Sequence, residues 1–268
     1  MNTQEFDRDA YLRLIGYDGK ITPSVESLKA LHHAQLYTIP FENFDIQLDK
    51  PIEIHSKAIF EKIVRKKRGG YCFELNGLFL MALQSFSFDV RPLLARVHVT
   101  GTPSSRSHQI ELITLAGKQW IADVGFGADT PRVPIPLELN KPTIFDEQKI
   151  RLVDAGHFGT MLQAEKNNGW IDLYSFDLSH VFSADLAQAN HFTSTHPGSL
   201  FVSSRIATLP VKSGAMTLLN NTLKKVVSGK ESVQELPEGQ AYMDALKEHF
   251  RIEIDEPFEN FLDLSTDI

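Results

Sequence analysis

Apolar residues recur at helical spacing through the first third of the chain. The stretch "SVESLKALHHAQLYTI" predicts a helix whose apolar stripe is made by Val25, Leu28, Leu31 and Leu36. Ser24 and Ser27 supply polar groups at its start. After Pro40 the stretch "PFENFDIQLDKPIEI" is expected to be extended, because a proline biases the residue before it away from helix.

Two more helices are expected before residue 88. "SKAIFEKIVRKKR" carries Ile59, Phe60 and Ile63 on one face. The clearest helix begins at Cys72, with apolar residues at Leu75, Leu78, Phe79, Ala82, Leu83 and Phe86. Gly69 and Gly70 provide the flexible turn that precedes it.

From Val90 to about Phe182 the pattern changes to short strands. "VRPLLARVHV", "HQIELITL", "QWIADVGF" and "IRLV" are rich in β-branched or aromatic residues and are separated by turn clusters. Beyond Asn190, "HFTSTHPGSLFVSSRIATLP" is expected to contribute further strands, and "QAYMDALKEHF" a closing helix. Because helices and strands are segregated along the chain, the expected class is α+β rather than alternating α/β.

Composition narrows the possible functions. The chain has 268 residues, of which 42% are hydrophobic and 23% charged, as in ordinary globular proteins. It lacks an apolar run near the roughly 20 residues of a membrane span, and the N-terminal "MNTQEFDRDAYLRLIG" is polar, so we expect a soluble, cytoplasmic protein without a membrane partner. A net charge of −7 argues against nucleic acid as the main partner.

Cysteine and histidine usage argues against metal chemistry. The chain has a single cysteine, which cannot form an internal disulfide; this fits a reducing compartment and excludes a Cys-rich zinc site. The ten histidines do not form HExxH or a comparable ligand spacing. We therefore expect no metal.

The single cysteine, Cys72, is either a nucleophile or a small core residue. A helix start favours the reactive thiolate, because its N–H groups and dipole attract negative charge. A free cysteine is nevertheless often an inert buried side chain. Gly69 and Gly70 favour the nucleophile, since they should leave the sulfur little covered. The basic run Arg65–Arg68 could add positive potential, but such a run is typical of a solvated face.

A cysteine nucleophile needs a base and an orienting group, and two downstream strands offer them. His108 opens one strand, and Asp123 ends the next, where a buried carboxylate would need a partner. If Gly117 and Lys118 form the hairpin loop, Leu112 pairs with Asp123, and the His and Asp are offset by four residues, roughly 13 Å. Contact between them then requires twist, a bulge or a different register. His98, on the preceding strand, is the alternative base, which we interpret as a surface or structural residue.

Several motifs together resemble one family. "RGGYCFELNGLF", "SHQIEL" and "WIADVGFG" are similar to the Cys, His and Asp motifs of the arylamine N-acetyltransferases. "YLRLIGYDG", "LHHAQLYTIPFENFDIQL" and "LYSFDLSHVFSADLAQANHFTSTHPGSLF" resemble further blocks of that family, up to about Leu209. Gln35 and the "FSF" at Phe86–Phe88 depart from patterns that many members share, LHxAH and LGF.

The resemblance implies a fold and a reaction. It implies a helical domain over residues 1–88, a β-barrel domain over 89–190 and an α/β lid over 191–268, around a cysteine-peptidase-like catalytic core. Cys72 would be the nucleophile, His108 the base and Asp123 the orienting group. Acetyl-CoA, as co-substrate and with no permanently bound cofactor, would acetylate the cysteine, and an arylamine, hydrazine or arylhydroxylamine would take the acetyl group.

Further site residues follow from the same resemblance. Glu42 and Arg68 would form a structural ion pair. The acceptor pocket would be lined by Phe41, Phe73, Val97 and Phe126. The pantetheine path would be lined by Ser107, Gly127 and Phe201. A phenylalanine is by itself more often a core residue than a ligand contact.

Other functions stay open from sequence alone. The same three residues could serve a cysteine hydrolase, a transglutaminase-type enzyme or a biosynthetic acyltransferase that closes amide bonds. A non-catalytic binding protein with a buried Cys72 is a further alternative. The physiological acceptor, the preferred acyl chain and the oligomeric state are left open by the sequence.

Overall fold

The computed structural model describes residues 6–166 and 169–264. The first residues of the polar N-terminal stretch, 1–5, and the end of the expected third domain, 265–268, lie outside the described residues. The helices are α1 Arg8–Ile15, α2 Val25–Leu36, α3 Phe44–Gln47, α4 Ser56–Ile59, α5 Cys72–Ser85, α6 Ser183–Thr195, α7 Leu200–Ser203 and α8 Gln240–Ala245. Two of them continue as π-helical turns, Phe60–Arg65 after α4 and Leu246–Phe250 after α8.

The strands form two antiparallel sheets. The larger contains β2 Asp89–Val97, β3 Arg106–Leu115, β4 Lys118–Ala122, β5 Ile135–Pro136, β6 Thr143–Phe145, β7 Gln148–Asp154, β8 Thr160–Lys166 and β9 Gly169–Phe176. The smaller contains β1 Phe41–Glu42, β10 Ile206–Val211, β11 Gly214–Leu219, β12 Thr222–Val227 and β13 Lys230–Glu235. This combination of helices and segregated antiparallel sheets is the α+β class that the sequence predicts.

The N-terminal helices follow the apolar periodicity. The α2 helix begins after Ser24, whose hydroxyl accepts the Ser27 N–H at 3.2 Å, and α5 begins at Cys72 as predicted. The prediction that the stretch after Pro40 is extended throughout was wrong in part, because α3 forms one helical turn there. Its first N–H, that of Phe44, donates to the Glu42 carboxylate at 2.8 Å, and the Phe44 side chain is buried.

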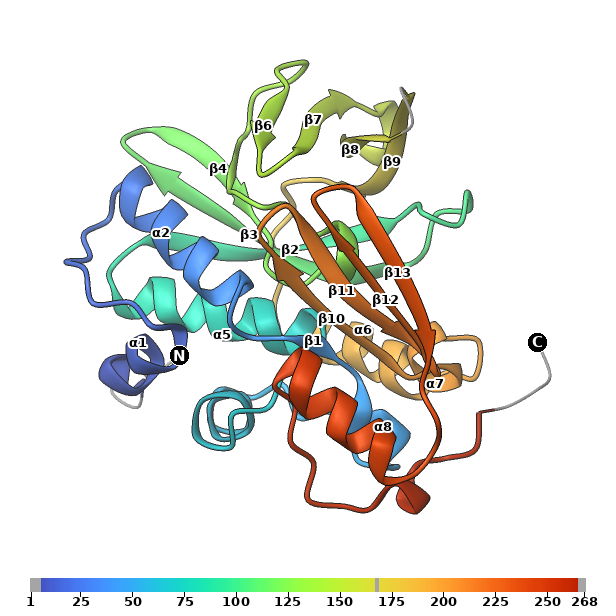
Figure 1. The fold of residues 1–268 in the computed structure, drawn as a ribbon. Coiled ribbons are helices and arrows are strands. Elements are labelled where there is room, and N and C mark those ends of the chain that lie inside the picture. The colour runs from blue at the N-terminus through green and yellow to red at the C-terminus, as the bar shows by residue number, and fades with distance from the viewer. Residues whose placement is uncertain (1–5, 167–168, 265–268) are drawn as a thin grey trace.

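The eight-stranded sheet curls into a barrel with a separate core on each face. Its order is β5-β4-β3-β2-β9-β8-β7-β6. Along β3, Ile110 and Leu112 belong to the cluster inside the barrel, whereas Ile113 and Leu115 belong to the cluster shared with the helices. This alternation follows from the two-residue period of a strand. The helices α5 and α6 contact β3 on the outer face, so the helix that begins at Cys72 lies directly against the strand of His108 (Figure 1).

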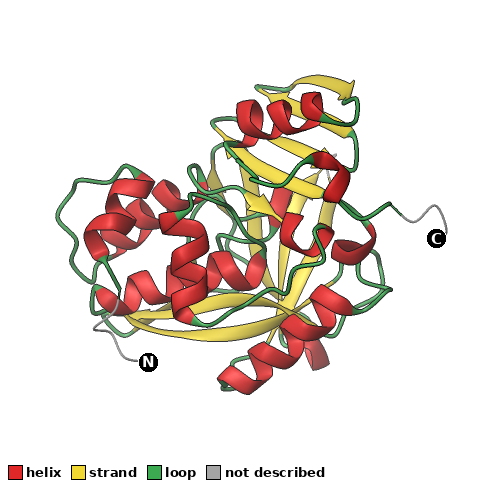
Figure 2. Cartoon of the chain, turned by 90° about the horizontal axis from the view of Figure 1, so that it is seen from below, coloured by secondary structure: helices red, strands yellow, loops and turns green. Residues whose placement is uncertain are grey.

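The smaller sheet combines one strand from the N-terminal part of the chain with four strands from the C-terminal part. The short strand β1 pairs with β10, with Phe41 opposite Thr208 and Glu42 opposite Ala207. Phe44, just after β1, packs in the apolar cluster of β10, β11 and α8. Seen from below, the helices lie in separate groups around the strands (Figure 2). The residues that precede α5 are therefore held against the C-terminal sheet.

The region after Phe182 was predicted correctly only in part: β10 and α8 were expected as strand and helix, whereas the segment before β10 was not predicted correctly. Within residues 191–203, expected as strand, residues 191–195 belong to α6 and 200–203 to α7. The helix α6 buries Leu186, Asn190 and Thr193, which are spaced four and three residues apart as on one helical face. Because two of these three residues are polar, an apolar pattern search does not detect the stripe. This helix also runs through residue 190, where the lid boundary was expected.

Within residues 6–166 and 169–264, the structure has no helix long and apolar enough to cross a membrane.

Candidate active site

His108 and Asp123 are in direct contact. His108 Nε2 lies 2.7 Å from Asp123 Oδ2, and both side chains are buried. The hairpin has a different register from the one considered above: the loop is Ala116–Gly117, with Leu115 opposite Lys118. Both loop residues have positive φ, 48° and 75°, as the two central residues of a type I′ turn require.

The corrected register brings the two side chains within reach. Glu111 faces Ala122, so Asp123, the next residue after β4, comes opposite Ile110 and is offset from His108 by two residues instead of four. A diagonal separation of about 7–8 Å between such positions is bridged by an imidazole and a carboxylate. The β4 strand ends at Ala122, and Asp123 accepts the N–H of Gly125 at 2.8 Å in a tight turn.

The Asp123 carboxylate is fully hydrogen-bonded although it is buried. Its Oδ1 accepts the Asn76 side-chain N–H at 3.0 Å in addition to the Gly125 N–H. Burial raises the pKa of Asp123, but the charge of His108 and these hydrogen bonds outweigh it, so the pKa lies below its usual value. Asp123 is therefore an anion under neutral conditions.

His108 is correspondingly a cation. Burial disfavours its charged form, but the Asp123 carboxylate, the hydrogen bond to it and the neighbouring Cys72 raise its pKa to about 10. Since Nε2 is engaged by Asp123, Nδ1 is the nitrogen left for exchange of a proton with a thiol. An imidazolium in this position stabilises a thiolate beside it.

Cys72 opens α5 at the point where the helix meets β3. Its Sγ lies 3.9 Å from the Ser107 carbonyl oxygen, one residue before His108. Gly125, in the turn after Asp123, packs on the same backbone: a Cβ at Gly125 would lie 3.0 Å from Cys72 Cα and 3.0 Å from Asn76 Nδ2. The loop that carries the carboxylate is thus fitted directly to the start of the cysteine's helix.

The Gly-Gly pair before the cysteine has another role than the one expected. Cys72 is only 3% exposed, so the glycines do not leave the sulfur uncovered. They allow close packing instead: a Cβ at Gly69 would lie 2.3 Å from the Pro40 carbonyl oxygen, and one at Gly70 would lie 2.7 Å from the Glu74 Cβ. The Glu42 N–H also donates to the Gly70 carbonyl at 2.9 Å, which places β1 beside the turn.

Arg68 and Glu42 form a buried ion pair. Arg68 donates to Glu42 Oε1 from Nε at 3.0 Å and from a terminal nitrogen at 2.8 Å. The same terminal nitrogen reaches Asp45 Oδ1 at 3.1 Å. In contrast, Arg65, Lys66 and Lys67 are exposed, as expected for a solvated face.

Comparisons with known proteins identify the family. A sequence model of the N-acetyltransferase family matches residues 24–258. An arylamine N-acetyltransferase of Escherichia coli strain K12 is 32% identical over 255 residues, covering 94% of this chain and 90% of its own. The chain belongs to the arylamine N-acetyltransferase family.

Solved arylamine N-acetyltransferases have the same fold. The structure of the Salmonella typhimurium enzyme matches with a TM-score of 0.89 and 31% identity, covering 93% of this chain and 92% of that chain. The Mycobacterium marinum enzyme in complex with CoA matches with a TM-score of 0.87 and 31% identity, covering 92% of this chain and 93% of that chain. The fold of this arylamine N-acetyltransferase family member is thereby shown.

The residues expected around the acceptor, together with Phe201 from the expected pantetheine path, fall into two groups. Phe126 packs its ring 4.9 Å from that of His108 and 4.9 Å from that of Tyr174, and Val97 pairs with Tyr174 across β2 and β9. The second group contains Phe41, Phe73 and Phe201. The Phe201 ring lies 5.9 Å from Phe41 and 5.6 Å from Tyr71, which in turn lies 5.6 Å from Phe73.

The remaining expected CoA contacts lie at the start of β3 and in the turn after Phe126. Ser107 is half-buried, and its hydroxyl lies 3.1 Å from that of Ser104. Gly127 has a φ of 71° and begins a short 3₁₀ turn after Phe126. Their ligand roles stay predictions. His98, the alternative base, lies 2.9 Å from the Ser175 hydroxyl and packs against Phe158.

Sequence reasoning missed three supporting residues. Asn76 donates to Asp123 and to the Gln109 carbonyl, and its Oδ1 accepts the Val124 N–H at 2.9 Å. His32 Nε2 lies 2.9 Å from the Asp123 carbonyl oxygen, and the Tyr174 ring packs against His108. Asn76 had a detectable signal, because it is a polar residue four positions after Cys72 on an otherwise apolar helix face.

Within the described parts of the chain, no three His, Cys, Asp or Glu side chains are grouped so as to hold a metal ion.

Proposed function

We propose that this protein transfers an acetyl group from acetyl-CoA to an arylamine, hydrazine or arylhydroxylamine through an acetyl thioester on Cys72. The observation that carries the proposal is the 2.7 Å contact between His108 and Asp123 beside a cysteine at a helix start. Membership of the arylamine N-acetyltransferase family supports the reaction, and the similarity to an M. marinum enzyme in complex with CoA supports the donor.

In the first half-reaction the Cys72 thiolate attacks the carbonyl carbon of acetyl-CoA. The carbon–sulfur bond to CoA breaks, the new one to Cys72 forms, and the CoA thiolate leaves with the proton from His108. Because one thioester replaces another, the step is nearly isoenergetic. The Cys72 backbone N–H lies in the first turn of α5, where N–H groups have no acceptor within the helix. It would donate to the oxyanion that forms on the carbonyl oxygen during the attack, a contribution of roughly 3 to 4 kcal/mol.

In the second half-reaction the acceptor nitrogen or oxygen attacks the acetyl-cysteine. Neutral His108 takes the proton from the acceptor, and the Cys72 thiolate is released. Asp123 keeps the imidazole oriented in both halves and stabilises its charged form. We propose that Phe41, Phe73, Val97 and Phe126 line the acceptor pocket.

The pantetheine arm of the donor would pass Ser107, Gly127 and Phe201, next to the cysteine and the histidine. No metal and no permanently bound cofactor takes part in this scheme. A cytoplasmic location stays a prediction, based on the single cysteine, which suits a reducing compartment.

Intact-protein mass spectrometry tests the proposal directly. Acetyl-CoA added without an acceptor should increase the protein mass by one acetyl group, and a later addition of an arylamine should remove it. Cys72→Ser is the control and should stay unmodified. No adduct on the wild-type protein, or an adduct that persists in Cys72→Ser, would contradict the proposal.

A further inference from the structure

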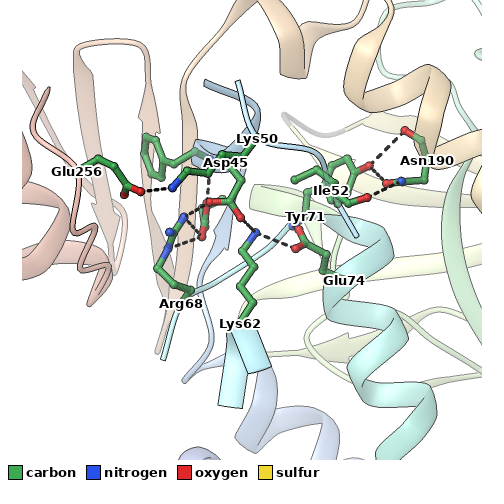
Figure 3. A network of polar contacts seen from close by, with 11 residues as sticks. Asp45, Lys50, Ile52, Lys62, Arg68, Tyr71, Glu74, Asn190 and Glu256 are labelled. Atoms are coloured by element: carbon green, nitrogen blue, oxygen red, sulfur yellow. Dashed lines mark hydrogen bonds and ion pairs between the residues drawn. The ribbon is translucent and has the colours of Figure 1, made fainter. Parts of the chain in front are cut away.

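A buried ion network lies next to the start of α5 (Figure 3). Its centre is Lys62, on the π-helical turn after α4, whose ammonium lies 2.7 Å from Asp45 Oδ2 and 2.7 Å from Glu74 Oε1. The Lys62 side chain is 14% exposed and that of Glu74 only 2%. An ion pair with this little solvent contact is screened far less than one on the surface.

Glu74 connects this network to the nucleophile. Its second oxygen, Oε2, accepts the backbone N–H of Tyr71 at 3.1 Å. Tyr71 is the residue that caps α5, directly before Cys72. A carboxylate three residues after the cap that bonds back to the cap N–H fixes the first turn of a helix. Lys62 therefore holds the group that fixes the backbone on which the cysteine sits.

The Glu74 carboxylate depends on Lys62 for its charge. Burial raises the pKa of Glu74, and Lys62 acts against that rise. Among the described residues, Lys62 is the one cation within salt-bridge distance of Glu74. Removal of the ammonium alone would leave a buried carboxylate without a counter-ion, which is strongly unfavourable.

The far end of the network is attached to β1 and α3. Asp45 receives a hydrogen bond from Arg68, and Arg68 pairs with Glu42, whose other oxygen accepts the Phe44 N–H. The side chains alternate in charge, with three carboxylates and two cations. The segments before and after the Gly-Gly turn are thus joined through buried charges.

A second contact holds the other side of Tyr71. The Tyr71 hydroxyl bonds to the side chain of Asn190 on α6, and Asn190 donates to the Ile52 carbonyl at 3.0 Å (Figure 3). The backbone of the cap residue is therefore fixed from the Lys62 side and its ring from the α6 side. With the ring held independently, a change at Lys62 acts on the backbone of the cap.

The network lies at the wall of a cleft that is separate from the candidate active site. This cleft has a volume of about 1040 Å³, and Asp45, Lys62, Arg68 and Glu74 are among the residues that line it. Cys72, His108 and Asp123 do not line it. The residues expected to contact acetyl-CoA and the acceptor do not line it either, so Lys62 is not expected to contact these ligands.

We propose that Lys62 is a positioning residue for Cys72, which it places by neutralising and holding the Glu74 carboxylate that caps α5. The inference rests on the proposed function, since it assigns a partner to the proposed nucleophile. It goes beyond the Glu42–Arg68 pair, because it is Glu74 that bonds to the cap of the cysteine's helix.

A double-mutant cycle tests the proposal. Lys62→Met keeps the side-chain length without the charge and should slow acetylation of Cys72 at saturating acetyl-CoA, on the order of 10- to 100-fold. The dissociation constant of CoA should not change. Adding Glu74→Gln should restore most of the rate, because a neutral amide oxygen still accepts the Tyr71 N–H and leaves no unpaired charge. Lys62→Arg, which keeps the charge, should also retain activity.

Lys50→Met is the matched control. Lys50 lines the same cleft and pairs with Glu256, but its side chain is 43% exposed, and this variant should acetylate at the wild-type rate. All rates are expressed per folded protein, measured by circular dichroism. If Lys62 had only a structural role, Lys62→Met would lower the midpoint of unfolding and leave the acetylation rate per folded protein unchanged.

The outcomes separate this inference from the proposed function. Absence of the acetyl adduct from wild-type protein would contradict the proposed function, whereas alkylation of Cys72 by iodoacetamide, which needs no acetyl-CoA, would still report the effect of Lys62. The inference is overturned if Lys62→Met reacts at the wild-type rate, or if the double variant is as slow as Lys62→Met. If neither Lys62→Met nor the double variant folds, the network serves stability alone, and the inference is also overturned.

Discussion

His108 and Asp123 meet at 2.7 Å because the hairpin between their strands turns at Ala116 and Gly117. A loop placed one residue later would offset the two side chains by four residues, too far for a hydrogen bond. The candidate active site therefore depends on two left-handed residues in a surface turn. Burial alone would disfavour the charge on each group, and the pair is charged because each ion stabilises the other.

Asp123→Asn should keep the fold and lower the rate of Cys72 acetylation by roughly two to four orders of magnitude, because the imidazolium loses its charged partner. The measurement is single-turnover acetylation followed by mass spectrometry. Asp129→Asn, in the turn that follows and paired with Lys166 at the surface, is the control and should be nearly normal. Near-normal acetylation by folded Asp123→Asn would contradict the role of Asp123.

The contribution of His108 to stability should fall as the pH rises. Its pKa is raised from 6.5 to about 10 on folding, so the stabilisation is fully present below pH 6.5 and is lost as the pH approaches 10. The free energy of unfolding, measured by denaturant titration for the wild type and for His108→Gln, should differ most near pH 6. A difference between the two proteins that stays constant from pH 6 to pH 10 would argue against the ion pair.

Gly125→Ala should impair both acetylation and stability. The new Cβ would press on Cys72 Cα and Asn76 Nδ2, so we expect a rate loss on the order of 10- to 100-fold and a destabilisation of about 1–3 kcal/mol. Gly169→Ala is the matched control, since its Cβ would meet only an atom 3.8 Å away. Equal rates for the two variants would show that the close approach at Gly125 has no effect on the nucleophile.

Ser87→Gly should stabilise the protein by about 1 kcal/mol. Ser87 follows α5 with a φ of 66°, and the Phe88 N–H donates to the Leu83 carbonyl at 3.0 Å, as in a Schellman motif. Glycine adopts this left-handed conformation without a steric penalty, whereas another residue is strained there. Thermal unfolding measures the gain. Ser87→Ala, which keeps the strain, should give none, and equal midpoints for both variants would count against this explanation.

Local patterns in the sequence predicted the elements that carry the candidate site. The start of α5 at Cys72 followed from helical periodicity after a Gly-Gly turn, and β3 and β4 followed from their β-branched and aromatic residues. The motifs around Cys72, His108 and Asp123 also predicted the family. The helix α6 was missed because its buried face includes Asn190 and Thr193, which have no hydrophobic signal.

The sequence by itself therefore determined the class of fold, the family and the three residues of the candidate site, because helical and strand periods and short motifs are local properties. Only the tertiary structure decided the hairpin register, the packing role of Gly69 and Gly70 and the link from Lys62 through Glu74 to Tyr71. Each of these is set by backbone dihedral angles or by contacts between segments distant along the chain. A spacing pattern in the sequence does not encode such contacts.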